Sequence, residues 1–403
     1  MKSDWTAVRV PRRWADGRYV WFLGALPPAL VYGSWHGVEQ TGWPAFWWSG
    51  VVVTFMVIPL IDRLVGTSTT NPPENLVPPL EAQRIFRWAT YLFVVNQYLA
   101  LIVACWLWSG GGAAPMTFVD KLGLALTVGL SGGLGINAAH ELGHKRPAVE
   151  RRLSKVALAQ TCYGHFFVEH NRGHHARVAT PEDPASARFG ESLYRFIPRS
   201  VVGGFRSAWR LECDRFERRE RSPWTLRNDI LNAWLLSVAL FGGLCLWFGI
   251  GVLGWLVVQA VLGCCLLEAV NYIEHYGLRR QRLPGGRYEP VRPEHSWNSD
   301  AMVTNVFLFQ LQRHSDHHAN PMRRYQTLRH AEDAPQLPAG YAEMLLYALI
   351  PPLWRKIMDP RVVAHYGGDL SLVALDPRTH RRPGSVHAEQ NPGVAGTHPI
   401  ACG

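Results

Sequence analysis

The sequence predicts an all-α integral membrane protein, in which six transmembrane helices carry a cytoplasmic, mostly helical cap with a histidine-rich dinuclear metal site. Three observations support this fold class. Long apolar runs alternate with strongly charged stretches over the 403 residues, and hydrophobic residues make up 48% of the chain. Many of the 17 tryptophans stand near the ends of these runs, as is typical of membrane interfaces. Nine of the 17 histidines fall into four compact groups.

The apolar runs define the expected transmembrane helices. A helix needs about 20 apolar residues to cross the hydrocarbon core of a bilayer. Six runs reach this length, and a short glycine-containing turn joins the last two. Their ranges are 19–37, 44–64, 88–109, 118–139, 230–250 and 252–272.

The charges of the loops predict the orientation of these helices. Arginine and lysine gather before the first run and between the second and third runs, whereas the loops after the first, third and fifth runs contain neither. Because positively charged loops stay in the cytoplasm, both termini are expected there. The net charge of +10 fits such loops and is not interpreted as nucleic-acid binding.

The spans divide the chain into five expected parts. Residues 1–139 form a cytoplasmic flank and the first four helices, and residues 230–272 form the last two. Residues 140–229 and 273–365 form the two halves of the cap. Residues 366–403 contain little apolar sequence and several prolines and glycines, which predicts a mostly disordered tail.

The spacing of the histidines indicates metal binding. His140 and His144 are four residues apart at the cytoplasmic end of the fourth run, and His170 and His174 repeat this spacing. Residues four apart share one face of a helix, so each pair can hold a metal ion through neutral imidazoles. Nine imidazoles exceed the demand of one ion, so two ions with four or five histidines each are expected. The candidate ligands are His140, His144, His170, His174, His175, His275, His314, His317 and His318.

The residues alone leave the kind of metal open between iron, copper and zinc. Imidazole suits all three, and the seven cysteines form no Cys-x-x-Cys pair. Carboxylates beside the histidines either orient ligand imidazoles by accepting the second ring N–H or are ordinary solvated acids. These carboxylates are Glu141, Glu169, Asp183, Glu274, Asp300 and Asp316.

The remaining histidines lack paired spacing. His275 also stands alone in its group, so spacing does not decide its role. His165, His295 and His330 lie close to the groups in sequence and are expected to support the site or the fold. No role is assigned to His36, His365, His380, His387 and His398.

The histidine groups stand in long motifs that resemble a known family. HELGHK (140–145), EHNRGHH (169–175) and LQRHSDHHA (311–319) match the histidine boxes of the integral-membrane di-iron alkane 1-monooxygenases, which are relatives of the membrane fatty-acid desaturases. NYIEHYG (271–277) matches a further motif that separates alkane hydroxylases from desaturases. The resemblance extends from about residue 15 to residue 365 and does not include the tail.

This resemblance implies O₂-dependent terminal hydroxylation of medium-chain n-alkanes in the bacterial inner membrane. It implies two non-haem irons held by all nine histidines, His275 included. It also implies electrons from rubredoxin, which a flavin-dependent rubredoxin reductase reduces. The chain contains no rubredoxin cysteine pairs, so the donor is expected to be a separate protein or a missing fusion partner.

A substrate without polar groups requires an apolar channel from the membrane. The small residues of the fourth run serve either close helix packing or a tunnel that leads to His140. Thr54 and Phe55 are candidates for the channel wall. The cytoplasmic cations either dock an acidic electron carrier or merely reflect the cytoplasmic bias of basic residues; they include Lys145, Arg146, Arg177, Arg279, Arg280, Arg323, Arg324 and Arg329.

Three alternatives remain beside the alkane hydroxylase. A fatty-acyl desaturase and a xylene-type methyl hydroxylase belong to the same superfamily, and the NYIEHYG motif disfavours the desaturase. A transition-metal transporter with cytoplasmic histidine sites belongs to a different class. A transporter is expected to carry ionisable residues at mid-membrane depth, and the centres of the six runs are nearly free of charge.

Overall fold

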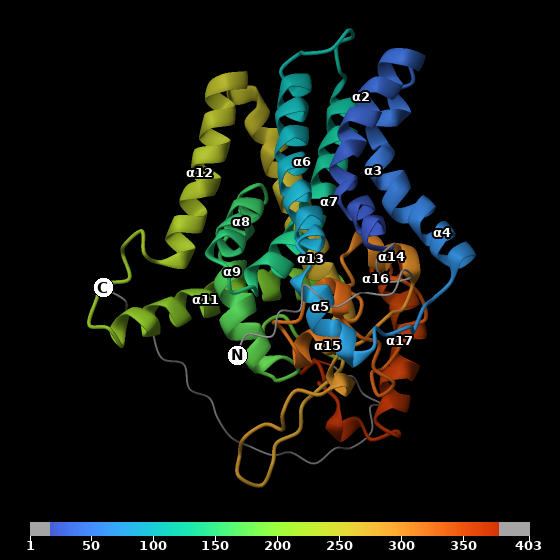
Figure 1. Cartoon of the computed structure of the whole chain (residues 1–403), viewed down its shortest axis with the longest axis vertical. Coiled ribbons are helices and arrows are strands. Elements are labelled where there is room, and N and C mark those ends of the chain that lie inside the picture. The colour runs from blue at the N-terminus through green and yellow to red at the C-terminus, as the bar shows by residue number, and fades with distance from the viewer. Residues whose placement is uncertain (1–16, 379–403) are drawn as a thin grey trace.

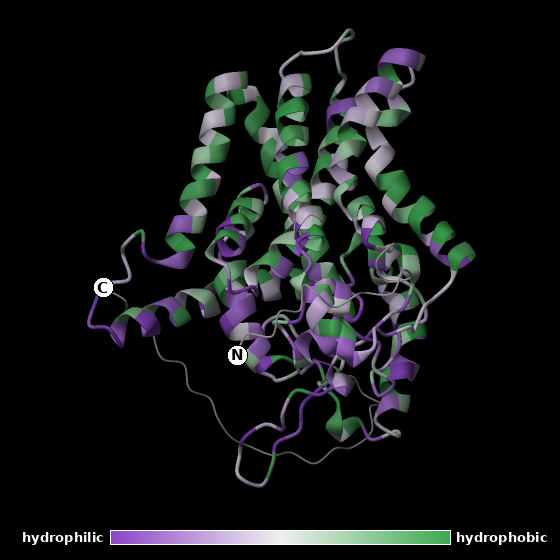
Figure 2. Ribbon diagram, in the orientation of Figure 1, coloured by the Kyte–Doolittle hydropathy of each residue, from purple (hydrophilic) through white to green (hydrophobic). Residues whose placement is uncertain are grey.

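The structure, a computed structural model, describes residues 17–378. Long helices stand together in the upper part of Figure 1, and the shorter helices of a cap gather beneath them. Hydrophobic residues cover much of the long helices, while hydrophilic residues concentrate in the cap (Figure 2). Over residues 17–378 the β structure is limited to isolated bridges. The prediction of an all-α protein is therefore confirmed.

Five helices within the described residues are long and apolar enough to cross a membrane, which fits a multi-pass membrane protein. They are Pro44–Val65, α6 (Ile85–Trp108), α7 (Phe118–Gly143), α12 (Asp229–Phe248) and Ile250–His275, whose main part is α13 (Leu253–His275). The first of these is composite. It joins η4 (Pro44–Trp48), α3 (Ser49–Val52), the π-helical turn η5 (Val53–Val57) and α4 (Ile58–Val65).

The first of the six predicted spans, at 19–37, is not confirmed as one long helix. The chain there forms the 3₁₀ segments η2 (Gly17–Ala25) and η3 (Pro27–Ala29), followed by α2 (Leu30–Thr41). Two successive prolines explain the interruption, since proline lacks the N–H that an α-helix needs. The N-terminal flank before residue 17 lies outside the described residues.

Helix α7 is the central helix of the bundle. A capping box fixes its start, in which the Asp120 backbone N–H donates to Thr117 Oγ1 (3.2 Å) and the Thr117 N–H donates to Asp120 Oδ2 (2.8 Å). Close packing against α13 follows from its glycines. A Cβ at Gly129 would lie 2.8 Å from the carbonyl oxygen of Gln259, so only glycine permits this approach. The small residues of this helix thus bring α7 and α13 into direct contact.

The cap consists of short helices and loops from three parts of the chain. Two of its helices are long or central to the site: α11 (Leu193–Glu217) runs beneath the bundle, and α15 (His314–Ala319) carries three of the candidate ligands. The remaining helices are α5 (Val77–Ala82), α8 (Ala148–Ala159), α9 (Phe166–Val168), η7 (Glu169–His174), α10 (His175–Arg177), α14 (Met302–Phe307), α16 (Tyr341–Ala348) and α17 (Pro351–His365), together with the 3₁₀ turns η6 (Glu74–Leu76), η9 (Pro293–His295), η10 (Tyr325–Thr327) and η11 (Leu370–Leu372). The 3₁₀ turn η8 (Ile250–Val252) is not part of the cap, because it joins α12 to α13.

The folded region extends past the expected boundary at residue 365. Val373 is 1% exposed within the main core cluster, and Leu375 forms a β-bridge with Phe189. Arg195 donates to Asp376 Oδ2 at 2.6 Å. Residues 366–378 therefore belong to the cap, and the apolar stretch LSLVAL (370–375) is the local signal that the average composition of 366–403 conceals. The rest of the predicted tail, 379–403, lies outside the described residues.

Candidate metal centre

The nine candidate histidines come from four segments that meet beneath the bundle. His140 lies in the last turn of α7, and His144 follows its end. His170, His174 and His175 belong to η7 and α10. His275 ends α13, and the last three histidines lie on α15. The structure brings all nine together in two groups of ring nitrogens, each within 4.8 Å of the others in its group.

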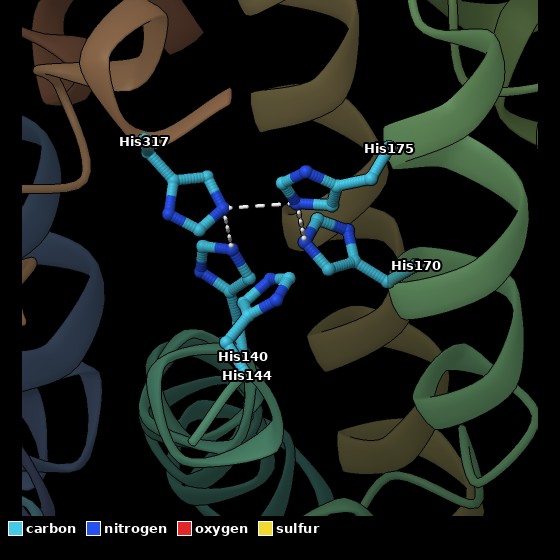
Figure 3. Close-up of side chains that lie close together, drawn as sticks. All are labelled: His140, His144, His170, His175 and His317. Carbon is cyan, nitrogen blue, oxygen red and sulfur yellow. Dashed lines mark hydrogen bonds between the residues drawn. The ribbon is translucent and has the colours of Figure 1, made fainter. Parts of the chain in front are cut away.

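The first group contains five histidines (Figure 3). His140 Nε2 lies 2.7 Å from His317 Nε2, and His175 Nε2 lies 3.0 Å from the same atom. His175 Nε2 also lies 3.1 Å from His170 Nε2. We call this set of His140, His144, His170, His175 and His317 the five-histidine group.

The second group contains four histidines and is almost closed to solvent. His318 Nε2 lies 3.2 Å from His174 Nε2 and 2.9 Å from His314 Nε2. His314 Nε2 in turn lies 3.3 Å from His275 Nε2. All four are buried, and His275 is 0% exposed. We call His174, His275, His314 and His318 the four-histidine group; its composition places His275 beside histidines from two other segments.

A π-helical turn divides the second histidine motif between the groups. The backbone N–H of His175 bonds to the carbonyl of His170, five residues earlier. In this wider turn residues five apart share a face, so His170 and His175 join one group while His174 joins the other. The pairing of His170 with His174 expected from four-residue spacing is therefore wrong. On α15 the regular spacing is kept, and His314 and His318 stay together.

Burial makes these imidazoles poor bases. Together with the neighbouring imidazoles, it lowers the pKa of His170, His175, His314, His317 and His318 well below the ordinary value. The rings are thus neutral at neutral pH, and their lone pairs are available to a cation. Metal–nitrogen bonds are about 2.0–2.1 Å long, so two nitrogens bound to the same ion at about a right angle are about 3 Å apart. The Nε2 atoms of each group converge at about this distance. The residues present therefore fit two first-row metal ions.

Two of the six candidate carboxylates contact a histidine of the groups. Asp183 Oδ2 accepts from His174 Nδ1 at 2.9 Å and from Ser186 Oγ at 2.6 Å. Although burial alone would raise the pKa of Asp183, these two partners lower it to about 2. Asp183 is therefore ionised and holds His174 with Nε2 directed into the group. Glu274 Oε2 lies 3.2 Å from His314 Nε2.

The other four carboxylates pair with groups outside the two sets. Lys145 lies 3.1 Å from Glu141, and Arg177 lies 2.8 Å from Glu169. Asp316 accepts from Arg323 at 2.8 Å. Asp300 Oδ2 lies 2.7 Å from Nδ1 of His330, which is outside both groups. These acids hold the surrounding cap together and do not contact the nine histidines.

The remaining histidines lie apart from the two groups. His165 is buried with neither ring nitrogen hydrogen-bonded among the described residues, and burial lowers its pKa to about 4. His295 Nε2 lies 3.2 Å from Glu289 Oε1. His36 is exposed and His365 packs against Tyr366. His380, His387 and His398 lie outside the described residues.

An apolar cavity of about 220 Å³ lies between the long helices and the cap. About 10–15 Å³ would suffice for a water molecule, so this space can take a larger apolar molecule. Along α7 its wall runs from Thr127 to Asn137, one helical turn before His140. Thr54 lines the cavity, whereas Phe55 packs against the main core cluster.

Sequence reasoning missed the part of the wall that comes from the cap. Thr304, Leu308 and Leu311 line the cavity from α14 and the loop after it, and Tyr341 and Leu345 line it from α16. The apolar run MVTNVFLF (302–309) directly before the third histidine motif is the signal that could have indicated this contribution.

Comparisons with known proteins agree with this geometry. A family model described as fatty acid desaturase matches residues 121–348, which include all nine histidines. The chain is 46% identical over 360 residues to an alkane 1-monooxygenase of Ectopseudomonas oleovorans, and the match covers 89% of each chain. It is 43% identical over 375 residues to an alkane 1-monooxygenase of Acinetobacter baylyi, covering 92% of this chain and 91% of that relative.

A more distant relative is the hydroxylase component of the xylene/toluene monooxygenase of Pseudomonas putida. It is 30% identical over 228 residues, which cover 56% of this chain and 59% of the relative. Identity and coverage are both higher for the alkane 1-monooxygenases. With the histidine groups and the desaturase-type region in place, the chain belongs to the alkane 1-monooxygenase family, within the membrane fatty acid desaturase and hydroxylase superfamily.

Proposed function

We propose that this protein hydroxylates medium-chain n-alkanes at the terminal carbon, using O₂ and two irons held by the nine histidines. One observation carries the proposal: two groups of converging imidazoles, all buried except the partly exposed His175, lie close to an apolar cavity among helices that fit a membrane. The two alkane 1-monooxygenases named above match this chain over 89% and 91% of their own length.

The five-histidine group would hold one iron and the four-histidine group the other. When bound, the irons supply the activation of O₂ that places one oxygen atom in the C–H bond and releases the other as water, at the expense of two electrons and two protons. Asp183 keeps His174 in the tautomer that presents Nε2 to the ion.

The apolar cavity selects the chain end by shape. An alkane offers no group for hydrogen bonding, so contact with the wall must orient it. Leu130, Leu134 and Asn137 follow one another along α7 toward His140, and all three line the cavity. A linear chain that enters from the lipid is thereby guided with its methyl group toward the histidines, while the apolar wall excludes water.

The proposed setting is the bacterial inner membrane, with both termini and the metal centre in the cytoplasm. The distribution of lysine and arginine among the loops supports this orientation. A cytoplasmic centre is accessible to a soluble electron donor, for which we propose rubredoxin, reduced by its own reductase.

The decisive experiment measures iron and product on the same purified protein. We expect about two irons per chain and conversion of octane to 1-octanol with rubredoxin and its reductase. His140→Ala and His317→Ala should lose both bound iron and product, because each removes a donor of the five-histidine group. His36→Ala, at an exposed position, is the matched control. Full activity in iron-free protein would overturn the proposal, while an alkene or an oxidised methylarene as the preferred product would favour a desaturase or a xylene-type hydroxylase.

A further inference from the structure

Glu274 occupies an unusual place beside the four-histidine group. It directly precedes His275 at the end of α13 and is 1% exposed. Its Oε2 lies 3.2 Å from His314 Nε2. Its second oxygen, Oε1, is buried and accepts no hydrogen bond of good geometry among the described residues, although Tyr341 lies beside the carboxyl group.

The nitrogen that Glu274 approaches distinguishes it from an orienting carboxylate. His314 Nε2 is the atom that faces His275 and His318, at 3.3 Å and 2.9 Å. His314 Nδ1, on the far side of the ring, has no hydrogen-bond partner in the described part of the chain. Asp183 behaves in the opposite way, because it contacts Nδ1 of His174 and leaves Nε2 free for the group. Glu274 therefore lies on the side of His314 where an ion would be bound.

Metal binding and a hydrogen bond at this position exclude each other. An imidazole nitrogen that binds a cation carries no hydrogen, so His314 Nε2 could no longer donate to Glu274. Two electron-rich atoms would then face each other at 3.2 Å in a buried place, which is unfavourable even with Tyr341 beside the carboxyl group. A cation shared by both atoms removes this conflict. Two donors that bind one ion at right angles with bonds of about 2.1 Å are about 3 Å apart, close to the observed distance.

We propose that Glu274 is an oxygen ligand of the ion held by the four-histidine group. This inference rests on the proposed metal centre. Each ion then has five protein donors: five imidazoles in one case, four imidazoles and one carboxylate in the other. The two ions are therefore chemically different, since a carboxylate adds negative charge and a harder donor to only one of them.

The position of Glu274 also connects this ion to the substrate cavity. Burial and the nearby Glu274 raise the pKa of Tyr341 well above its ordinary value, which places the two side chains next to each other. Tyr341 lines the apolar cavity. The carboxylate-bearing ion is thus also connected to the cavity wall, through Tyr341.

The test compares Glu274→Gln with Glu141→Gln in protein loaded with ⁵⁷Fe and held in the diferrous state. Glu141 is the matched control, because it is also buried and also adjacent to a candidate ligand in sequence, but it pairs with Lys145 instead of a histidine. In Glu274→Gln, Mössbauer spectra should show one changed and one unchanged quadrupole doublet. One of the two irons should also be lost to a chelator at least about tenfold faster. Both doublets and both loss rates should stay unchanged in Glu141→Gln.

A measurement on the unmodified sequence covers the case in which Glu274→Gln does not fold. Infrared difference spectra between the zinc-loaded and metal-free protein, with ¹³C-labelled glutamate, should show the carboxylate stretches of one glutamate shifting on metal binding. Unchanged doublets in folded Glu274→Gln, or the absence of an isotope-sensitive shift, would overturn the inference. If the unmodified protein bound no iron, the proposed function itself would fail, so the two failures are distinguishable.

Discussion

At the scale of single residues, two carboxylates approach opposite nitrogens of histidines in the candidate metal centre. Asp183 accepts from the remote nitrogen of His174, and a hydroxyl group of Ser186 keeps the carboxylate in place. Glu274 approaches the nitrogen of His314 that faces its group. The first arrangement fixes a ring orientation, and the second would offer a donor to an ion bound by the four-histidine group. The side of the ring therefore decides which of the two roles a buried carboxylate near a histidine can take.

Asp183→Asn should weaken one of the two metal sites. The amide keeps the size of the side chain but loses the charge that holds the Nδ1–H tautomer of His174, so iron should be retained about 10- to 100-fold less well at one site. Chelator competition with iron quantification measures this loss. Asp300→Asn is the matched control, because Asp300 contacts Nδ1 of His330 at 2.7 Å in the same way but outside both groups. Equal iron retention in the two variants would contradict the assigned role of Asp183.

At the scale of elements, the π-helical turn η7 determines how the second histidine motif is shared. A regular α-helix would place His170 and His174 on one face. The extra residue in the turn brings His170 and His175 together at 3.1 Å between their Nε2 atoms and directs His174 to the four-histidine group. One short element thus contributes to both groups, which fixes their spacing relative to each other. Such turns are frequent at functional sites.

Double substitutions in this turn should reveal the division. His170→Ala and His175→Ala remove donors from the same group, so their effects on iron affinity should be strongly non-additive. His170→Ala combined with His174→Ala affects different groups and should lose both irons. Iron content and Mössbauer doublets of the three single and two double variants provide the measurement. A pattern in which His170 couples to His174 and not to His175 would contradict the structure.

At the scale of the whole molecule, the close contact of α7 and α13 leaves the apolar cavity at one side of their interface. Glycines allow the two helices to approach, while Leu130, Leu267 and Val270 contribute apolar side chains to the wall. The outer helix α12 has a different character, since Leu246 is 91% exposed and faces outward as a lipid-facing residue would. The bundle therefore provides a lipid-facing surface and an internal apolar space that ends at the cap.

Leu130→Phe should shorten the range of alkanes that the enzyme accepts. Leu130 and Asn137 both line the cavity, and Leu130 is farther from His140 along α7. A larger side chain at Leu130 therefore reduces the room for long chains and leaves the end of the cavity near the histidines unchanged. Product yields over a series of n-alkanes should shift toward shorter substrates, with iron content unaltered. Leu235→Phe on α12, where the native leucine is 48% exposed, is the control. An unchanged chain-length profile would argue against this cavity as the substrate site.

Charge reversal on α11 should impair electron delivery. Arg206 and Arg210 are exposed, lie one helical turn apart and line an open cleft that also contains Asp183. An acidic carrier docked there would stand close to the four-histidine group. The double variant Arg206→Glu/Arg210→Glu should reduce kcat/KM for rubredoxin about tenfold or more at low ionic strength and flatten its salt dependence. Arg219→Glu, at an exposed position beyond the end of α11, should keep the original salt profile. A double variant with that same profile would place the donor elsewhere.

Local patterns in the sequence determined the all-α class, five of the membrane-spanning helices and the set of histidines that the structure gathers. Length, hydropathy and the spacing of histidines are properties of neighbouring residues, so they can be recognised without the fold. The interruption of the first run could also have been inferred locally, because Pro27 and Pro28 stand inside it.

Only the tertiary structure decided how the histidines are divided and which acids touch them. The π turn changes the face on which His174 lies, and the contacts of Glu274 with His314 and of Asp300 with His330 join residues that are far apart in the chain. Val373 is buried by cap segments far away in the chain, such as those that contain Leu193 and Trp354. These features depend on contacts between distant segments, and hydrophobic periodicity carries no information about such contacts.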